Sequence, residues 1–70
     1  MRYTVIVEST DGETEFTCEC ETLESAQAEL LEQYNQDCMT LGLPTRNKFL
    51  PTFRRYRTPY TTGEIIDNEA

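Results

Sequence analysis

The sequence contains no histidine and no tryptophan, and it has only three glycines among its 70 residues. Without histidine, the chain lacks both the commonest proton-transfer group at neutral pH and the commonest metal ligand. It also has no glycine-rich phosphate loop and no serine in a nucleophile elbow. Its carboxylates lie in polar stretches, whereas acid–base catalysis needs desolvated ones. We therefore expect a non-enzymatic protein without a cofactor.

Cysteine is scarce as well: Cys18, Cys20 and Cys38 are an odd number of thiols. A small secreted scaffold usually has more cysteines, in pairs. Three thiols without histidine do not make a zinc site, and the absence of a Cys-x-x-Cys motif argues against redox catalysis. Because all three fall on predicted inward faces, we interpret them as core-filling residues and expect no metal.

Basic residues are outnumbered, six against thirteen acidic ones, which gives a formal net charge of −7. Such a charge repels nucleic acid and favours basic protein surfaces. No apolar run is long enough to span a membrane, and the start of the chain lacks a signal-peptide pattern. We expect a cytoplasmic monomer with no small-molecule substrate, no direct nucleic-acid binding and no membrane association.

The first twenty residues have the alternation of a β-hairpin. Residues 2–9 and 13–20 each place apolar side chains on one face, and Asp11-Gly12 between them predicts a two-residue type I′ turn. That turn fixes the register, since a slip of one residue would bury the glutamates. The predicted inward pairs are Tyr3 with Cys20, Val5 with Cys18, and Val7 with Phe16.

The outer face of this hairpin is acidic. The same register sets Arg2 opposite Glu21, which is favourable, and Glu8 opposite Glu15, which is not. Glu8, Glu15 and Glu19 thus form either a patch for a basic partner or a solvated face whose charges protect the sheet.

A helix is predicted next, with Thr22 as its N-cap, Gly42 just after its last turn and Pro44 preventing continuation. The apolar residues at helical spacing are Leu23, Ala26, Leu30, Tyr34 and Cys38, widened by Leu31 and Leu41. We expect this stripe to cover the inward face of the hairpin.

The remaining chain predicts one more strand. A proline-broken connection, 43–52, leads to residues 53–58, where Arg55 and Arg57 share one face and Arg54 and Tyr56 the other. We therefore predict an α+β fold, a single ββαβ domain over 1–58 with a three-stranded antiparallel sheet on one helix. Residues 59–70 are expected to be a C-terminal tail, either flexible or a short edge strand.

Half of the basic residues fall in the run Arg54-Arg55-Tyr56-Arg57. Arginine and tyrosine are typical anchors of protein interfaces, because the guanidinium offers a fixed fork of donors. The run either binds a partner or neutralises the acidic hairpin through cross-strand pairs.

Several short blocks also recur in a known family. They comprise a Val-Glu-Ser strand end, a Glu-Thr-Leu helix start, an alanine in the first turn, a Gln-Tyr near the helix end and a late Arg-x-Arg. The residues are Val7, Glu8, Ser9, Glu21, Thr22, Leu23, Ala26, Gln33, Tyr34, Arg55 and Arg57. In these the chain resembles the small host RNA polymerase inhibitors encoded by gene 2 of T-seven-type coliphages. The connection before Arg55 is longer here than in that family.

The resemblance implies a three-stranded sheet on one helix and a location in the host cytoplasm. It also implies binding to the β′ jaw of bacterial RNA polymerase, in the downstream DNA channel, which blocks open promoter complex formation. The binding residues implied are Glu8, Arg55 and Arg57, beside the candidates Arg54, Tyr56, Glu15 and Glu19.

Two alternatives remain open at this point. The charge of −7 and the glutamate-rich face are also typical of an acidic DNA mimic that inhibits another target, such as a restriction or CRISPR effector. A small assembly module, joined through an edge strand, is the other.

Overall fold

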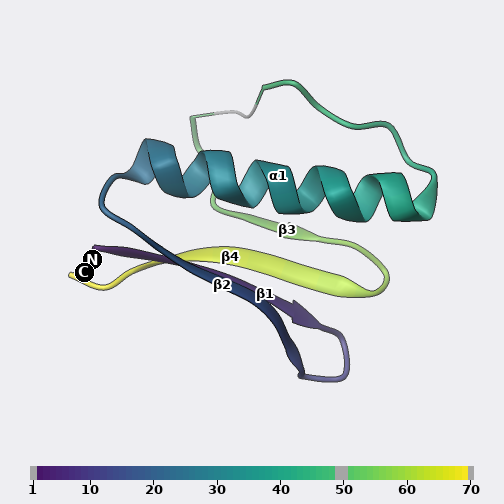
Figure 1. The fold of residues 1–70 in the computed structure, drawn as a ribbon, viewed down its shortest axis with the longest axis horizontal. Helices are drawn as coiled ribbons and strands as arrows, with labels where there is room; N and C mark the ends of the chain where they lie inside the picture. The colour runs from purple at the N-terminus through teal and green to yellow at the C-terminus, as the bar shows by residue number, and fades with distance from the viewer. Residues whose placement is uncertain (1, 49–50, 70) are drawn as a thin grey trace.

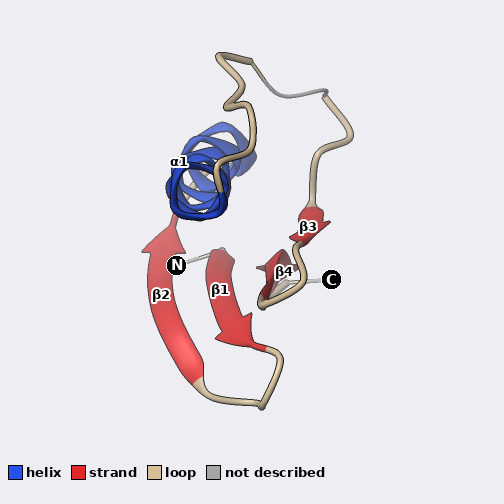
Figure 2. Ribbon diagram, turned by 90° about the vertical axis from the view of Figure 1, so that its right-hand side faces the viewer, coloured by secondary structure: helices blue, strands red, loops and turns tan. Residues whose placement is uncertain are grey.

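The computed structural model describes residues 2–48 and 51–69, with both polypeptide ends at the same end of the sheet (Figure 1). In chain order its elements are β1 (Tyr3–Ser9), β2 (Thr14–Cys20), α1 (Leu23–Leu41), β3 (Arg55–Arg57) and β4 (Thr61–Asp67). The strands form one antiparallel sheet in the order β2-β1-β4-β3. The helix covers one face of this sheet, and no other described element covers the opposite face (Figure 2). The predicted α+β class is confirmed.

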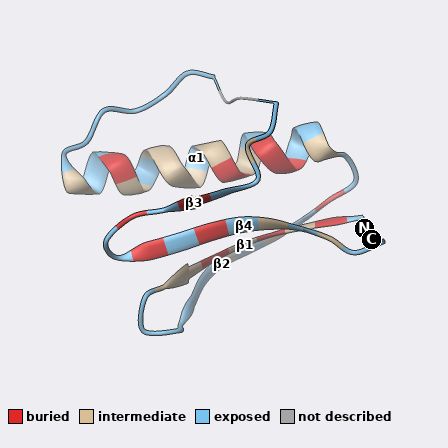
Figure 3. Cartoon of the chain, turned by 180° about the vertical axis from the view of Figure 1, so that it is seen from behind, coloured by how far each residue is buried: buried red, intermediate tan, exposed pale blue. Residues whose placement is uncertain are grey.

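The predicted three-stranded sheet is wrong, because residues expected to form a tail supply the fourth strand. β4 lies in the interior of the sheet, paired with β1 from Tyr3↔Asp67 to Ser9↔Thr61 and with β3 on its other side. Its residues alternate between buried and exposed positions (Figure 3). The strand predicted over 53–58 is shorter, Arg55–Arg57, and it is one of the two edge strands, with β2 at the other edge.

The β1–β2 turn also differs from the prediction. Gly12 has a φ of 95°, but no other described residue except Gly42 has a positive φ, so the turn is not type I′. Instead, the Gly12 N–H donates to the Ser9 carbonyl (3.0 Å) and the Ser9 N–H donates to the Glu13 carbonyl (2.8 Å). These bonds close a three-residue loop that needs a left-handed residue at its end, which glycine supplies.

The predicted hairpin register is nevertheless confirmed for its three inward pairs, Tyr3↔Cys20, Val5↔Cys18 and Val7↔Phe16. A β-bulge between Val7 and Glu8 compensates for the extra loop residue. The bulge places Glu8 opposite Thr14, so the predicted like-charge pair with Glu15 is wrong.

Arg2 also has different partners from the predicted Glu21. Its guanidinium lies 3.4 Å from carboxylate oxygens of both Asp67 and Glu69. The reason is the position of β4, which brings the C-terminal carboxylates beside the start of β1.

Both predicted ends of the helix are confirmed. The Thr22 hydroxyl accepts the Ser25 N–H at 3.1 Å, and Gly42 adopts the left-handed conformation at the C-terminal end, with φ 74°. Ala26, Leu30 and Cys38 of the predicted stripe are buried. Ala26 and Leu30 pack with the inward residues of the sheet, and the described core comprises Tyr3, Val5, Val7, Cys20, Ala26, Leu30 and Tyr56.

Candidate functional site

β3 is held in place by its central residue, Tyr56, which is only 8% exposed. Its hydroxyl donates to Asp37 Oδ2 on α1 at 2.7 Å, and the Thr61 hydroxyl donates to the same oxygen at 2.8 Å. Burial raises the pKa of Tyr56 well above its ordinary value, and the bond to the Asp37 carboxylate raises it further. One helix carboxylate thus joins the edge strand and β4 to α1.

Gly63 of β4 makes room for the ring. Tyr56 and Gly63 are cross-strand partners, and a Cβ on Gly63 would lie 2.4 Å from Tyr56 Cε2 and 2.9 Å from Leu30 Cδ1. The far side of the ring meets Tyr34 edge-on, with 5.2 Å between centroids and an interplanar angle of 66°. The Tyr56 ring is therefore packed between Gly63 of the sheet and Tyr34 of the helix.

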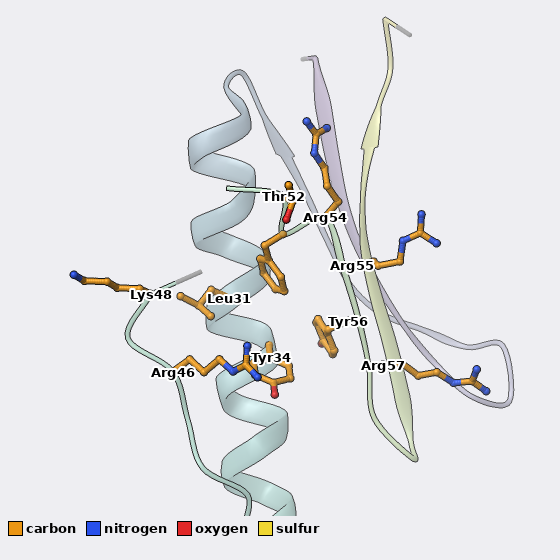
Figure 4. A pocket seen from close by; sticks show the side chains of 10 residues that line it. Leu31, Tyr34, Arg46, Lys48, Thr52, Arg54, Arg55, Tyr56 and Arg57 are labelled. Atoms are coloured by element: carbon orange, nitrogen blue, oxygen red, sulfur yellow. The ribbon is translucent and has the colours of Figure 1, made fainter. Parts of the chain in front are cut away.

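This inward tyrosine determines where its neighbours point. Because side chains alternate along a strand, Arg55 and Arg57 are directed to the other face, and both are exposed. Figure 4 shows Tyr34 and Tyr56 facing one another between α1 and β3, with Arg55 and Arg57 extending away from the helix. The prediction that the two arginines share one face is confirmed.

On that face the arginines line a shallow hollow, which we call the outer hollow. It extends over three strands, and its lining includes Ile6, Glu8, Thr62, Glu64, Arg55 and Arg57. Glu8 pairs with Thr62, which pairs in turn with Arg57, so Glu8 and Arg57 lie in one cross-strand row. Arg55 lies in the next row, opposite Glu64. The fold thus brings together Glu8, Arg55 and Arg57.

The two arginines carry no ion pair within residues 2–48 and 51–69, where the ion pairs are those of Arg2. In the described structure, Arg55 and Arg57 therefore do not neutralise the acidic hairpin through ion pairs. Their guanidinium groups remain available to a partner.

Glu15 and Glu19 lie on β2, the opposite edge strand of the sheet, and neither lines the outer hollow. The Glu19 carboxylate accepts the hydroxyl of Thr4 on β1 at 3.2 Å from each oxygen. Glu8 therefore lines the outer hollow with the two arginines, whereas Glu15 and Glu19 do not.

A second hollow, the inner groove, lies on the helix side of β3. It has a volume of about 510 Å³ and lies between α1, the connection and β3. Its apolar lining is Leu31, Tyr34, Phe53 and Tyr56. Arg46, Lys48 and Arg54 also line it, together with Arg55 and Arg57, whose guanidinium groups extend away from the helix (Figure 4). No acidic residue is among the described residues that line it. Five of the six basic residues of an acidic chain thus surround one short strand.

The connection that carries part of this lining is tied to α1 by two amides that the sequence analysis missed. Gln27, 3% exposed, donates through Nε2 to the carbonyls of Pro51 (3.0 Å) and Phe53 (3.1 Å). Asn35 bonds the backbone of Arg46 through both atoms of its amide, at 2.7 and 2.9 Å. The only sequence signal for Gln27 was its position on the edge of the apolar stripe.

The cysteines are free thiols, with Cys18 intermediate and Cys20 and Cys38 buried. Burial raises the pKa of Cys20 to about 11, and the neighbouring Cys18, whose sulfur lies 3.9 Å away, adds to this. The thiol is therefore protonated at neutral pH and is a poor nucleophile. Among the described residues, no group of three or more Cys, Asp or Glu is arranged to hold a metal ion. No described helix is long and apolar enough to cross a bilayer.

Comparison of the chain with protein-family models, curated proteins and solved structures finds no match.

Proposed function

We propose that this protein is a non-enzymatic, phage-type inhibitor that binds bacterial RNA polymerase. Its binding site would be the β′ jaw in the downstream DNA channel, and binding would block formation of the open promoter complex. One observation supports the proposal above all: Glu8, Arg55 and Arg57 line a single hollow. These are the residues that the resemblance to the phage inhibitors implies, and they come from strands that are far apart in the sequence.

The physical basis of the proposal is that Arg55 and Arg57, which have no ion pair among the described residues, lie on a strand that is fixed in position. Tyr56 is fixed by its bond to Asp37 and its contact with Gly63, so the strand that bears both arginines is held before a partner arrives. Preorganisation reduces the entropy lost on binding. Guanidinium groups can then form paired, charge-assisted hydrogen bonds with carboxylates of the partner, while Glu8 meets a cation.

The net charge supports the location of this binding. A chain of charge −7 is attracted to the basic walls of a DNA channel and competes there with DNA. Because the polymerase is cytoplasmic, the protein would act in the cytoplasm of the host cell, as a monomer.

The direct test is size-exclusion co-migration with purified bacterial RNA polymerase, coupled to transcription from a housekeeping promoter. The wild-type chain should co-migrate and suppress transcription, and the double variant Arg55→Ala/Arg57→Ala should do neither. The matched control is Glu15→Gln/Glu19→Gln, which also changes two charges on exposed strand positions but leaves the outer hollow intact.

Absence of wild-type co-migration at micromolar concentration would refute the proposal. If the glutamate variant lost binding while the arginine variant kept it, the surface would be an acidic DNA mimic instead.

A further inference from the structure

The backbone of β3 has one unpaired edge. Thr58 N–H donates to the Thr61 carbonyl (2.8 Å) and Ile65 N–H donates to the Arg54 carbonyl (2.9 Å). In an antiparallel ladder, hydrogen-bonded and non-hydrogen-bonded pairs alternate, so Tyr56 also bonds towards β4. The N–H and C=O groups of Arg55 and Arg57 therefore point away from β4, and no described strand pairs with β3 on that side.

This edge lies between the two hollows. A strand added beside β3 would place the side chains opposite Arg55 and Arg57 on the outer face, next to the guanidinium groups. The side chain opposite Tyr56 would instead enter the inner groove, where Leu31, Tyr34 and Phe53 supply apolar surface. Acidic side chains on one face of the added strand would thus contact the guanidinium groups, and an apolar side chain on the other face would contact the apolar lining of the inner groove.

We propose that β3 is a docking edge for an extended acidic–apolar–acidic segment of a protein partner, which adds as a fifth strand. This inference rests on the proposed protein-binding function, and it adds the chemistry and the backbone conformation of the segment that is bound. The occupant is defined by charge complementarity, because Arg55 and Arg57 are exposed on the outer face and have no ion pair among the described residues. Four backbone hydrogen bonds, two at Arg55 and two at Arg57, would set its register.

The other edge of the sheet lacks this arrangement. β2 carries Glu15 and Glu19 and a β-bulge, features that discourage pairing with another strand. An acidic segment is therefore repelled from β2 and attracted to β3.

The test is fluorescence anisotropy with a labelled, end-capped peptide of sequence Ser-Thr-Glu-Leu-Glu-Thr-Ser and the full-length protein. Two control peptides match it. One has the same composition with the core reordered to Glu-Glu-Leu, which breaks the alternation. The other carries N-methyl groups on the two glutamate amides, which removes two backbone donors and leaves every side chain in place.

Each control should bind about tenfold more weakly than the parent peptide, since that factor corresponds to the loss of one or two net hydrogen bonds. Arg55→Ala/Arg57→Ala should weaken the parent peptide to a similar extent. A second pair of variants tests the inner groove. Leu31→Ala, which changes the lining of that groove, should weaken binding of the parent peptide, whereas Ile6→Ala, the control on the outer face, should not.

Equal binding of the three peptides would overturn the proposal, because simple charge attraction needs no register. Tighter binding of a single-stranded oligonucleotide, or concentration-dependent self-association that excludes the peptide, would overturn it as well. Polymerase binding without peptide binding would refute only this inference. Peptide binding without polymerase binding would refute only the proposed target.

Discussion

The ring of Tyr56 occupies the space that a side chain at Gly63 would need. The two residues face each other across β3 and β4, and a Cβ on Gly63 would lie 2.4 Å from Tyr56 Cε2. β3 has only three residues, and this contact and the bond to Asp37 add to its backbone pairing with β4. The orientation of Arg55 and Arg57 depends on the same contact.

Gly63→Ala should therefore destabilise the fold by about 1–3 kcal/mol, the usual cost of overpacking, because the Tyr56 ring and the Leu30 side chain occupy the space that the added methyl group needs. Urea denaturation followed by circular dichroism measures this change. Thr62→Ala, at the next, exposed position, should alter the free energy of unfolding by less than about 0.5 kcal/mol. Equal free energies of unfolding for the two variants would contradict the close packing of Tyr56 against Gly63.

Tyr56→Phe removes the hydroxyl that donates to Asp37 and keeps the ring. We expect a loss of about 1–2 kcal/mol in the free energy of unfolding, moderated because Thr61 still donates to the same oxygen. The control is Tyr60→Phe, since Tyr60 is 64% exposed. Chemical denaturation measures the free energy of unfolding of both variants. If Tyr56→Phe is as stable as wild type, the Tyr56 hydroxyl contributes nothing to the stability of the fold.

Stability should fall in alkali. Folding raises the pKa of Cys20 from 9.0 to about 11 and raises that of Tyr56 above its ordinary 10.0, in both cases chiefly through burial. The unfolded chain therefore releases these protons at lower pH than the folded one. Their stabilising contribution is complete below about pH 9 and is lost as pH rises towards 11 and beyond.

Urea midpoints measured between pH 7 and pH 11 test this prediction. The midpoint should be steady up to about pH 9 and then fall. The decline should be smaller in Tyr56→Phe, which lacks the buried phenol. A midpoint that rose between pH 9 and pH 11 would contradict the assigned burial of both groups.

A chain that ends at Thr58 should not fold. It lacks β4, the strand that joins β1 to β3, and it exposes Val5 and Val7 on the inward face. A chain that ends at Asn68 loses the exposed ion pair of Arg2 with Glu69 and the bond from the Glu69 N–H to Asp67, and it keeps all of β4. Circular dichroism should show a cooperative thermal transition for the longer chain alone, and a folded chain of 58 residues would refute the topology.

The sequence predicts the hairpin and the helix because their signals are local. Alternation fixes the register of β1 and β2, and Thr22 and Gly42 mark the helix ends through bonds within one turn. The turn itself was mispredicted as type I′. Its Asp11-Gly12 pair is compatible with several loop lengths, and only the compensating bulge shows which one is used.

The sequence allows residues 59–70 to be a flexible tail or a short edge strand, but it does not predict an interior strand, because two inward positions of β4 are not apolar. Thr61 and Gly63 are buried in place of aliphatic residues, one to reach Asp37 and the other to admit the ring of Tyr56. Asp37 lies on the helix and Tyr56 on the neighbouring strand, so the alternation of residues within β4 alone does not indicate either reason. The sequence placed Arg55 and Arg57 on a common face, but the position of Glu8 beside them depends on β4.

The measurement that bears most directly on the central claim is isothermal titration of bacterial RNA polymerase with the wild-type protein and with Arg55→Ala/Arg57→Ala. Our account predicts micromolar or tighter binding of the wild-type chain, and at least about a hundredfold loss in the variant, since two buried, charge-assisted contacts would be removed. Equal affinities of the two proteins would contradict it, as would the absence of any binding by the wild-type chain.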